Sequence, residues 1–99
     1  MKLVFTPTAE AQAKEMDAWW RAHREKAPAL FARELAEACE VIATTPTVGT
    51  TYSTAGGTHV RRVRLPKTRN HLYFEVDAAA ETVVVLMIWG SPRGEGPEL

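Results

Sequence analysis

The feature that most constrains the fold is an apolar run near the carboxyl end of the chain. Residues 82–89 read TVVVLMIW, so the side chains on both faces of a strand formed there are apolar. A strand that is apolar on both faces belongs in the middle of a sheet and not at its edge. The run is also far too short to span a bilayer. It therefore predicts a central strand.

Two more strands are expected immediately before this one, over residues 59–65 and 70–77. The connections at 66–69 and 77–81 are short enough for antiparallel neighbours. A further short strand is predicted at residues 2–5. The intervening segment 46–58 is rich in Thr and Gly and is expected to be a loop.

Two amphipathic helices are predicted between the first strand and this loop. Thr8 is the expected N-cap of the first helix, which runs to about Lys26, and Glu10 suits its first turn. The second helix starts near Pro28 and ends before Pro46. Helical spacing relates Ala9, Ala13, Met16 and Trp20 in the first helix, and Phe31, Leu35, Ala38 and Ile42 in the second.

Together these elements predict one α+β domain: a short N-terminal strand, an antiparallel helical hairpin, and then a three-stranded antiparallel sheet. Ninety-nine residues, 45% of them apolar, are enough for one small core. The single Cys39 excludes an intrachain disulfide and is expected to be a small buried apolar side chain. Nothing at the amino terminus resembles a signal peptide, so a cytoplasmic protein is expected.

Positive charge is concentrated in one stretch, although the whole chain has a formal net charge of zero. Residues 46–74 contain no acidic residue and carry Arg61, Arg62, Arg64, Lys67 and Arg69. Such a stretch suits an anionic partner, either a phosphate backbone or an acidic protein segment. Charge alone does not choose between them, and the neutral total argues against bulk nucleic-acid binding.

Period-two alternation assigns the strand residues to faces. Leu72, Phe74 and Val76 are expected to face the helices. The opposite face then collects four candidate residues, and a fifth could fold in from the tail: Arg62, Arg64, His71, Tyr73 and Arg93. Arginine binds phosphate bidentately and His or Tyr can move a proton, so these residue types fit phosphodiester chemistry. The alternative is a solvated sheet face whose charges keep the protein soluble, and composition alone favours that alternative.

Arg61 and Trp19 are two further candidates. Alternation places Arg61 on the helix-facing side, where an acidic residue of the second helix would be its partner. Trp19 lies about 100° from Trp20 around the helix, so it is expected to be partly exposed, as an interface anchor would be. An apolar stripe wide enough for both Trp residues is the alternative.

Metal and cofactor sites are not predicted. His23, His59 and His71 are scattered, and Cys39 has no companion cysteine. Gly56-Gly57 lacks the lysine and the spacing of a phosphate-binding P-loop.

Four segments, in this order, resemble the RelE/ParE superfamily of toxins from bacterial type II toxin–antitoxin systems. They are AWWRAHREKAPALFARELAEA, IATTPTVG, VRRVRLPKTRNHLYFEVD and VVVLMIWGSPRGEGPEL. The resemblance covers nearly the whole chain. It implies a small strand–helix–helix–three-strand domain that is neutralised by a cognate antitoxin, with Trp19, Arg61, Lys67, Arg69 and Tyr73 as expected partner-binding residues.

The resemblance also suggests where an active site would lie. RelE-like members cleave mRNA on the ribosome, by attack of a ribose 2′-hydroxyl on the adjacent phosphate. Their two basic positions on the second strand align with Arg62 and Arg64. The third position, an arginine in relatives, aligns with His71, and the fourth, just after the last strand, aligns with Arg93. The tail tyrosine of that site has no counterpart in SPRGEGPEL.

Three functions are therefore open. The chain is a ribosome-dependent mRNA endonuclease, or a ParE-like inhibitor of DNA gyrase without nuclease activity, or a degenerate toxin that only binds antitoxin. None of these readings requires a cofactor, a metal or a membrane.

Overall fold

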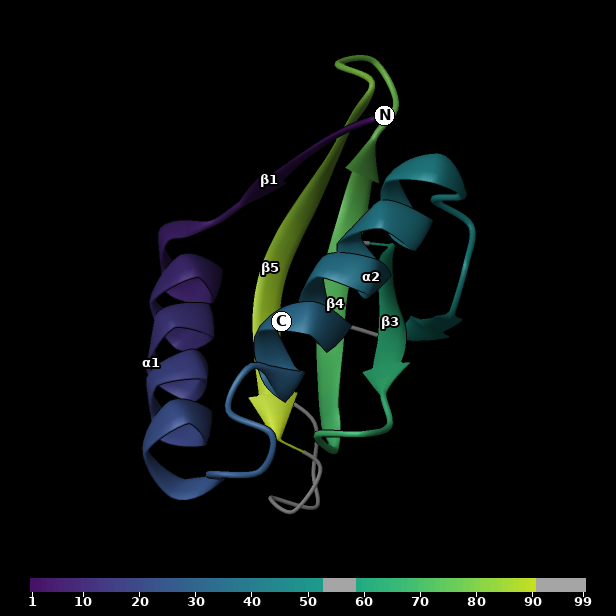
Figure 1. Ribbon diagram of the computed structural model, residues 1–99. Helices are drawn as coiled ribbons and strands as arrows, with labels where there is room; N and C mark the ends of the chain where they lie inside the picture. Colours follow the sequence, from purple (N-terminus) through teal and green to yellow (C-terminus); the bar gives the residue numbers. More distant parts are fainter. Residues whose placement is uncertain (53–58, 91–99) are drawn as a thin grey trace.

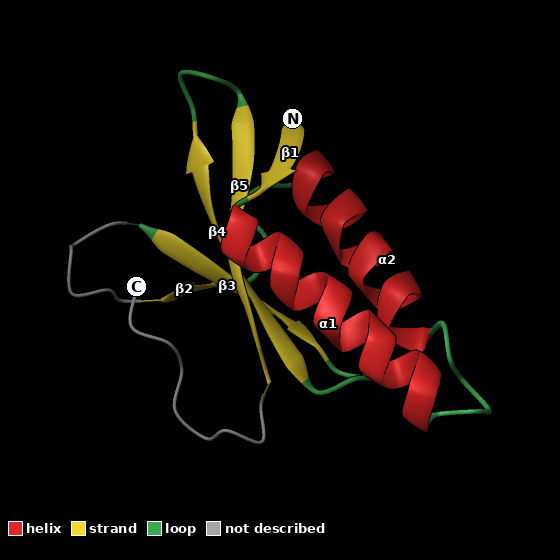
Figure 2. Ribbon diagram, turned by 90° about the vertical axis from the view of Figure 1, so that its left-hand side faces the viewer, coloured by secondary structure: helices red, strands yellow, loops and turns green. Residues whose placement is uncertain are grey.

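Both helices pack on one face of a five-stranded sheet, and no helix formed by the described residues covers the other face (Figure 1, Figure 2). The structure, a computed structural model, describes residues 1–52 and 59–90. Its elements in chain order are β1 (Lys2–Phe5), α1 (Pro7–His23), α2 (Leu30–Thr44), β2 (Thr50–Tyr52), β3 (Val60–Leu65), β4 (Asn70–Asp77) and β5 (Thr82–Gly90).

The sheet is mixed and has the strand order β1-β5-β4-β3-β2. β1 runs parallel to β5, and every other neighbouring pair is antiparallel. The α+β class and the helical hairpin are as expected, but the prediction of a three-stranded antiparallel sheet is wrong. β1 joins the sheet as a fourth strand, and β2 forms a fifth within the segment that was expected to be a loop.

β5 occupies the interior position that its apolar sequence predicts, between β1 and β4 (Figure 1). The β4–β5 register shifts between Tyr73 and Phe74, because Tyr73 lies opposite Met87 whereas Phe74 lies opposite Val85. Leu86 is thus an extra residue in β5, as in a β-bulge.

Helix α1 begins two residues earlier than expected, and its cap is Thr6 instead of Thr8. The Thr6 hydroxyl accepts a hydrogen bond from the Ala9 N–H at 3.1 Å, and Pro7 takes the first helical position. Proline suits that position because its missing N–H would have no helical acceptor there. α1 ends at His23, and α2 ends at Thr44, before Pro46.

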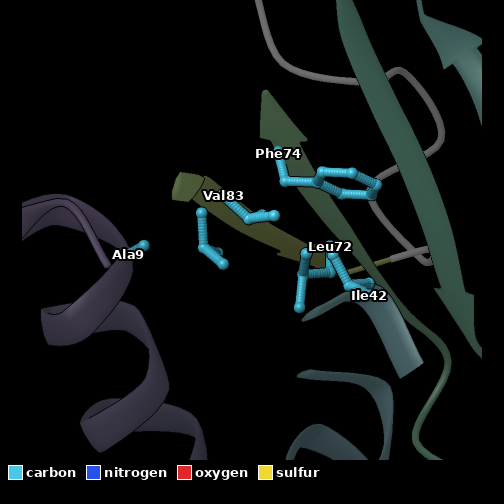
Figure 3. Close-up of a cluster of buried hydrophobic side chains, with 6 residues drawn as sticks. Ala9, Ile42, Leu72, Phe74 and Val83 are labelled. Atoms are coloured by element: carbon cyan, nitrogen blue, oxygen red, sulfur yellow. The ribbon is translucent and has the colours of Figure 1, made fainter. Parts of the chain in front are cut away.

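The core between the helices and the sheet contains two clusters of buried side chains. Figure 3 shows the first cluster, in which Ala9 of α1 and Ile42 of α2 lie against the strand residues Leu72, Phe74, Val83 and Val85. The second cluster contains Phe31, Leu65 and Ile88. The predicted orientation of Leu72 and Phe74 toward the helices is confirmed, and Val76 packs against the same cluster.

Cys39 packs against the first cluster, as the sequence predicts. Burial raises the pKa of its thiol to about 11. The side chain is therefore protonated at neutral pH and lacks the thiolate that cysteine chemistry requires.

Candidate functional site

The face of the sheet that points away from the helices collects the candidate residues of β3 and β4 into two cross-strand rows. Arg64 lies opposite His71, and Arg62 lies opposite Tyr73. β5 extends the rows with Trp89 and Met87. Cross-strand partners share a face of the sheet, so these residues form one surface, which we call the open face.

Tyr73 differs from the exposed residue that was expected at this place, because it is only 1% exposed. The ring of Tyr52, from β2, meets it edge-on with centroids 4.8 Å apart. The Arg62 guanidinium lies 5.8 Å from the centre of the Tyr52 ring. The unpredicted strand β2 thus adds an aromatic side chain that helps to cover Tyr73.

Burial raises the pKa of the Tyr73 phenol, although a hydrogen bond from Arg62 and the charge of Arg62 oppose this shift. The phenol is therefore protonated at neutral pH. It is a poor proton acceptor there, and its hydroxyl contributes to the open face by contact with Arg62.

His71 lies beside both arginines, and its pKa shifts in the opposite direction to that of Tyr73. Its pKa is lowered from the ordinary 6.5, first by burial and then by the positive charges of Arg62 and Arg64. The imidazole is consequently neutral at pH 7. A neutral imidazole next to two fixed cations is suited to accept a proton while those cations hold an anion.

Arg62, Arg64 and His71 are therefore brought together as the sequence predicts. Arg64 is exposed and Arg62 is half-buried, so a ligand on this face has direct access to the Arg64 guanidinium. Arg93 lies outside the described residues. The arrangement can bind a phosphate group or a carboxylate through the arginines.

Arg61 has a structural role on the opposite face, and its predicted acidic partner is wrong. Its guanidinium donates hydrogen bonds to the backbone carbonyls of Thr47, Val48 and Gly49. Gly49 has a φ of 84°, and a Cβ at this position would collide with the Arg62 carbonyl oxygen. Arg61 and Gly49 thus fix the entry into β2, which carries Tyr52 to the open face.

The remaining candidates, Trp19, Lys67 and Arg69, meet on the helix side of the molecule. A groove of about 640 Å³ lies between the carboxyl half of α1 and the β3–β4 turn. We call it the Trp groove; it is lined by Met16, Trp19, Trp20, Arg24, residues 67–70 and Gly90. Trp19 is 44% exposed, as the sequence predicts, whereas Trp20 packs against the second core cluster.

Glu34 of α2 fixes the turn that carries Lys67 and Arg69. Its two carboxyl oxygens accept hydrogen bonds from the Lys67 N–H at 2.7 Å, the Thr68 N–H at 3.0 Å and the Thr68 hydroxyl at 2.6 Å. Glu34 is only 7% exposed. The sequence analysis did not predict a role for Glu34. Its position three residues after Phe31 places an acidic side chain on the apolar stripe of the helix, and this could have indicated a buried carboxylate with hydrogen-bond donors around it.

Within the described residues, no group of three His, Cys, Asp or Glu side chains could hold a metal ion. None of the helices formed by those residues has the length and apolarity needed to cross a membrane.

The fold and the open face define a small α+β domain that presents arginines and a neutral histidine on the sheet face away from its helices. Residues 3–93 match the sequence model of the family described as ParE toxin of type II toxin-antitoxin system, parDE. The chain belongs to this family, which confirms the resemblance to the RelE/ParE superfamily. Membership makes it a type II toxin–antitoxin toxin and implies a cognate antitoxin as its partner. A search of curated proteins finds no match.

Proposed function

We propose that this toxin cleaves mRNA on the ribosome, with the open face as its active site. The observation that supports this most directly is the cross-strand pair of Arg64 and His71, with Arg62 in the neighbouring row. Arg62 and Arg64 bind the scissile phosphate and neutralise the charge that develops on it. Arg93 is a further cation for the same phosphate in this proposal.

The chemical step needs a base, and His71 is suited to that role. The ribose 2′-oxygen attacks phosphorus while His71 takes the 2′-hydroxyl proton. The bond from phosphorus to the 5′-oxygen breaks, and that oxygen takes a proton from water. The hydroxide that remains takes the proton from His71 and restores the neutral imidazole. The products are a 2′,3′-cyclic phosphate and a 5′-hydroxyl end, so atoms and charge balance without a cofactor.

The second candidate is inhibition of DNA gyrase without cleavage of RNA. It is favoured by the family match, which carries the ParE name. The burial of Tyr73 also favours it, because that phenol cannot serve as an exposed second proton carrier. In this case the open face binds a protein and performs no catalysis.

The test is to add the purified protein to a translating extract and to map the mRNA ends, with wild type, Arg64→Ala and His71→Gln compared. We expect cleavage by wild type and a loss of about 10²-fold or more in His71→Gln, which is typical of removing a positioned acid or base. Arg33→Ala is the matched control, because Arg33 is an exposed cation on α2, away from the open face. It should cleave like wild type.

The pH dependence gives a second readout. Neutral His71 is the active form, so the cleavage rate should rise with pH through the lowered pKa of His71 and level off near neutrality. An intact message together with accumulating gyrase-cleaved DNA would assign the protein to the gyrase inhibitors instead.

A further inference from the structure

We propose that Tyr52 and Tyr73 are positioning residues, which hold the guanidinium of Arg62 in one place on the open face. The three side chains come from neighbouring strands, in the order β4, β3 and β2. Tyr73 is the cross-strand partner of Arg62, and Tyr52 is paired with Val60, two residues before Arg62 on the same face of β3. Such diagonal neighbours are within reach of long and aromatic side chains.

The proposal deepens the proposed function, because it assigns the residues that orient one cation of the same site. Its effect on cleavage rests on that function. The restraint on Arg62 does not, and it can be measured in the isolated toxin.

Two contacts restrain the Arg62 guanidinium. It donates a hydrogen bond to the Tyr73 hydroxyl. It also lies 5.8 Å from the centre of the Tyr52 ring, within the range of a cation–π interaction. The two rings meet edge-on with centroids 4.8 Å apart, and Tyr73 is only 1% exposed. The guanidinium is therefore bound to groups that are themselves held by packing.

Arg62 and Arg64 consequently differ in how freely they move. Arg64 is exposed, whereas Arg62 is half-buried. An arginine side chain loses much rotamer freedom when it binds an anion. Arg62 has already lost most of this freedom in the folded protein, and a cation fixed in advance needs no reorganisation as charge develops on a bound phosphate. We therefore assign transition-state stabilisation mainly to Arg62 and the first capture of the phosphate to Arg64.

Tyr52 is itself held through the backbone of β2. Thr50 pairs with Arg62, so β2 lies directly beside the residue that it helps to position. Arg61 donates hydrogen bonds to the backbone carbonyls of residues 47–49, at the entry into this strand. The two adjacent arginines thus act in sequence: the first fixes β2, and β2 brings Tyr52 to the second.

The position of the Arg62 charge affects the neighbouring His71. The His71 ring lies 6.4 Å from the Tyr73 ring, so a guanidinium bound to the Tyr73 hydroxyl stays beside the imidazole. Burial first, and then the charges of Arg62 and Arg64, lower the pKa of His71. An Arg62 that turned into solvent would contribute less, and the pKa of His71 would rise toward 6.5. This pKa therefore reports whether Arg62 is held.

The experiment measures the pKa of His71 by NMR titration of its imidazole in the full chain. Tyr73→Phe keeps the ring and removes the hydroxyl. We expect it to raise the pKa of His71 by about 0.2 or more, the effect of moving a unit charge a few ångströms away at a solvated surface. Tyr52→Leu should raise it too. In an Arg62→Gln background neither substitution should have a further effect, because no charge is left to position.

Phe74→Leu is the matched control. Phe74 is the next residue of β4, and its ring is buried on the helix side of the sheet. The substitution therefore weakens the same strand without removing a contact of Arg62, and the pKa of His71 should stay as in wild type. An unchanged pKa in both tyrosine variants, or an equal rise in the Arg62→Gln background, would overturn the proposal.

Cleavage of mRNA in the translating extract measures the consequence for catalysis. At saturating toxin, Tyr73→Phe should cleave about ten-fold more slowly, while the toxin concentration that gives half the maximal rate stays within about two-fold. If wild type cleaves no mRNA, the proposed function fails, and the titration still decides whether the tyrosines position Arg62. If wild type and Tyr73→Phe cleave equally fast, the two tyrosines have no positioning role in the reaction.

Discussion

At the scale of single residues, two charged side chains on the helix-facing side of the sheet act on the backbone. Arg61 binds three carbonyls that lead into β2, and Glu34 binds two N–H groups of the β3–β4 turn. Each one fixes a segment that carries functional candidates, Tyr52 in the first case and Lys67 and Arg69 in the second. Both charged side chains therefore stabilise the fold, although Arg61 fixes a segment beside the open face and Glu34 fixes a turn that lines the Trp groove.

Replacing Glu34 with Ala should destabilise the fold by about 2–3 kcal/mol, because it removes the acceptor of three hydrogen bonds in a mostly buried place. Urea unfolding followed by circular dichroism measures the free energy of unfolding. Glu37→Ala, on the exposed side of the same helix, should change it by less than about 0.5 kcal/mol. Equal effects of the two substitutions would show that Glu34 does not hold the turn.

His71 should make the folded state less stable in mild acid. Its folded pKa is lowered below the ordinary 6.5, so the unfolded chain binds the proton first as the pH falls. The free energy of unfolding therefore decreases from about pH 6.5 downward, until the folded imidazole also becomes protonated, whereas above that pH the residue has no such effect.

The measurement is the free energy of unfolding at pH 7 and at pH 5, for wild type and for His71→Gln. Carboxylates contribute to the loss in both proteins, so the difference between the two losses isolates His71. Wild type should lose more stability than His71→Gln. An equal or smaller loss in wild type would contradict the lowered pKa.

At the scale of elements, the start of α1 is joined to the irregular part of β5 through Thr6. Its hydroxyl accepts from the Ala9 N–H and donates to the Leu86 carbonyl at 3.0 Å. One side chain thus caps the helix and satisfies the bulged residue of the central strand.

Thr6→Ala should therefore lower the free energy of unfolding by about 1–2 kcal/mol, the usual effect of losing an N-cap. Thr8→Ala is the matched control, because Thr8 is exposed and lies inside the first turn. It should have an effect below about 0.5 kcal/mol. Thermal or urea unfolding of the two variants compares them directly, and a larger effect at Thr8 would restore it as the cap.

The sequence predicts correctly those helices and strands in which apolar residues recur with a clear period. Alternation placed Arg62, Arg64 and His71 on one face correctly, since strand pairing leaves only two faces to choose from. β2 could not be predicted, because Thr50-Thr51-Tyr52 lacks apolar alternation and is held by pairing with β3 and by contacts of Arg61. The burial of Tyr73 followed from β2 and was missed for the same reason.

Contacts between segments far apart in the sequence were the other features that the sequence could not predict. The parallel pairing of β1 with β5 joins residues about 80 positions apart, and no local pattern specifies it. The bonds from Glu34 to the β3–β4 turn likewise depend on how α2 lies across the sheet. The Trp groove is a third case, because its walls come from α1 and from the β3–β4 turn, which are far apart in the sequence.

At the scale of the whole molecule, the two core clusters are physically continuous. Phe5 and Leu35 pack against both of them, one from β1 and the other from α2. Neither cluster can lose its packing without exposing side chains that also support the other. We therefore expect the described core to unfold as one cooperative unit.

Urea unfolding followed by two probes tests this expectation. Far-ultraviolet circular dichroism reports the helices and strands. Tryptophan fluorescence reports on Trp20, which packs against the second cluster, and also on Trp19 of α1 and Trp89 of β5. The two transitions should coincide in wild type. Leu35→Ala should shift both midpoints together, with a loss of about 2–3 kcal/mol from truncating a side chain shared by the clusters. A fluorescence transition that precedes the dichroism transition, in wild type or in Leu35→Ala, would contradict the single cooperative unit. It would show that the structure around the tryptophans opens before the rest of the fold.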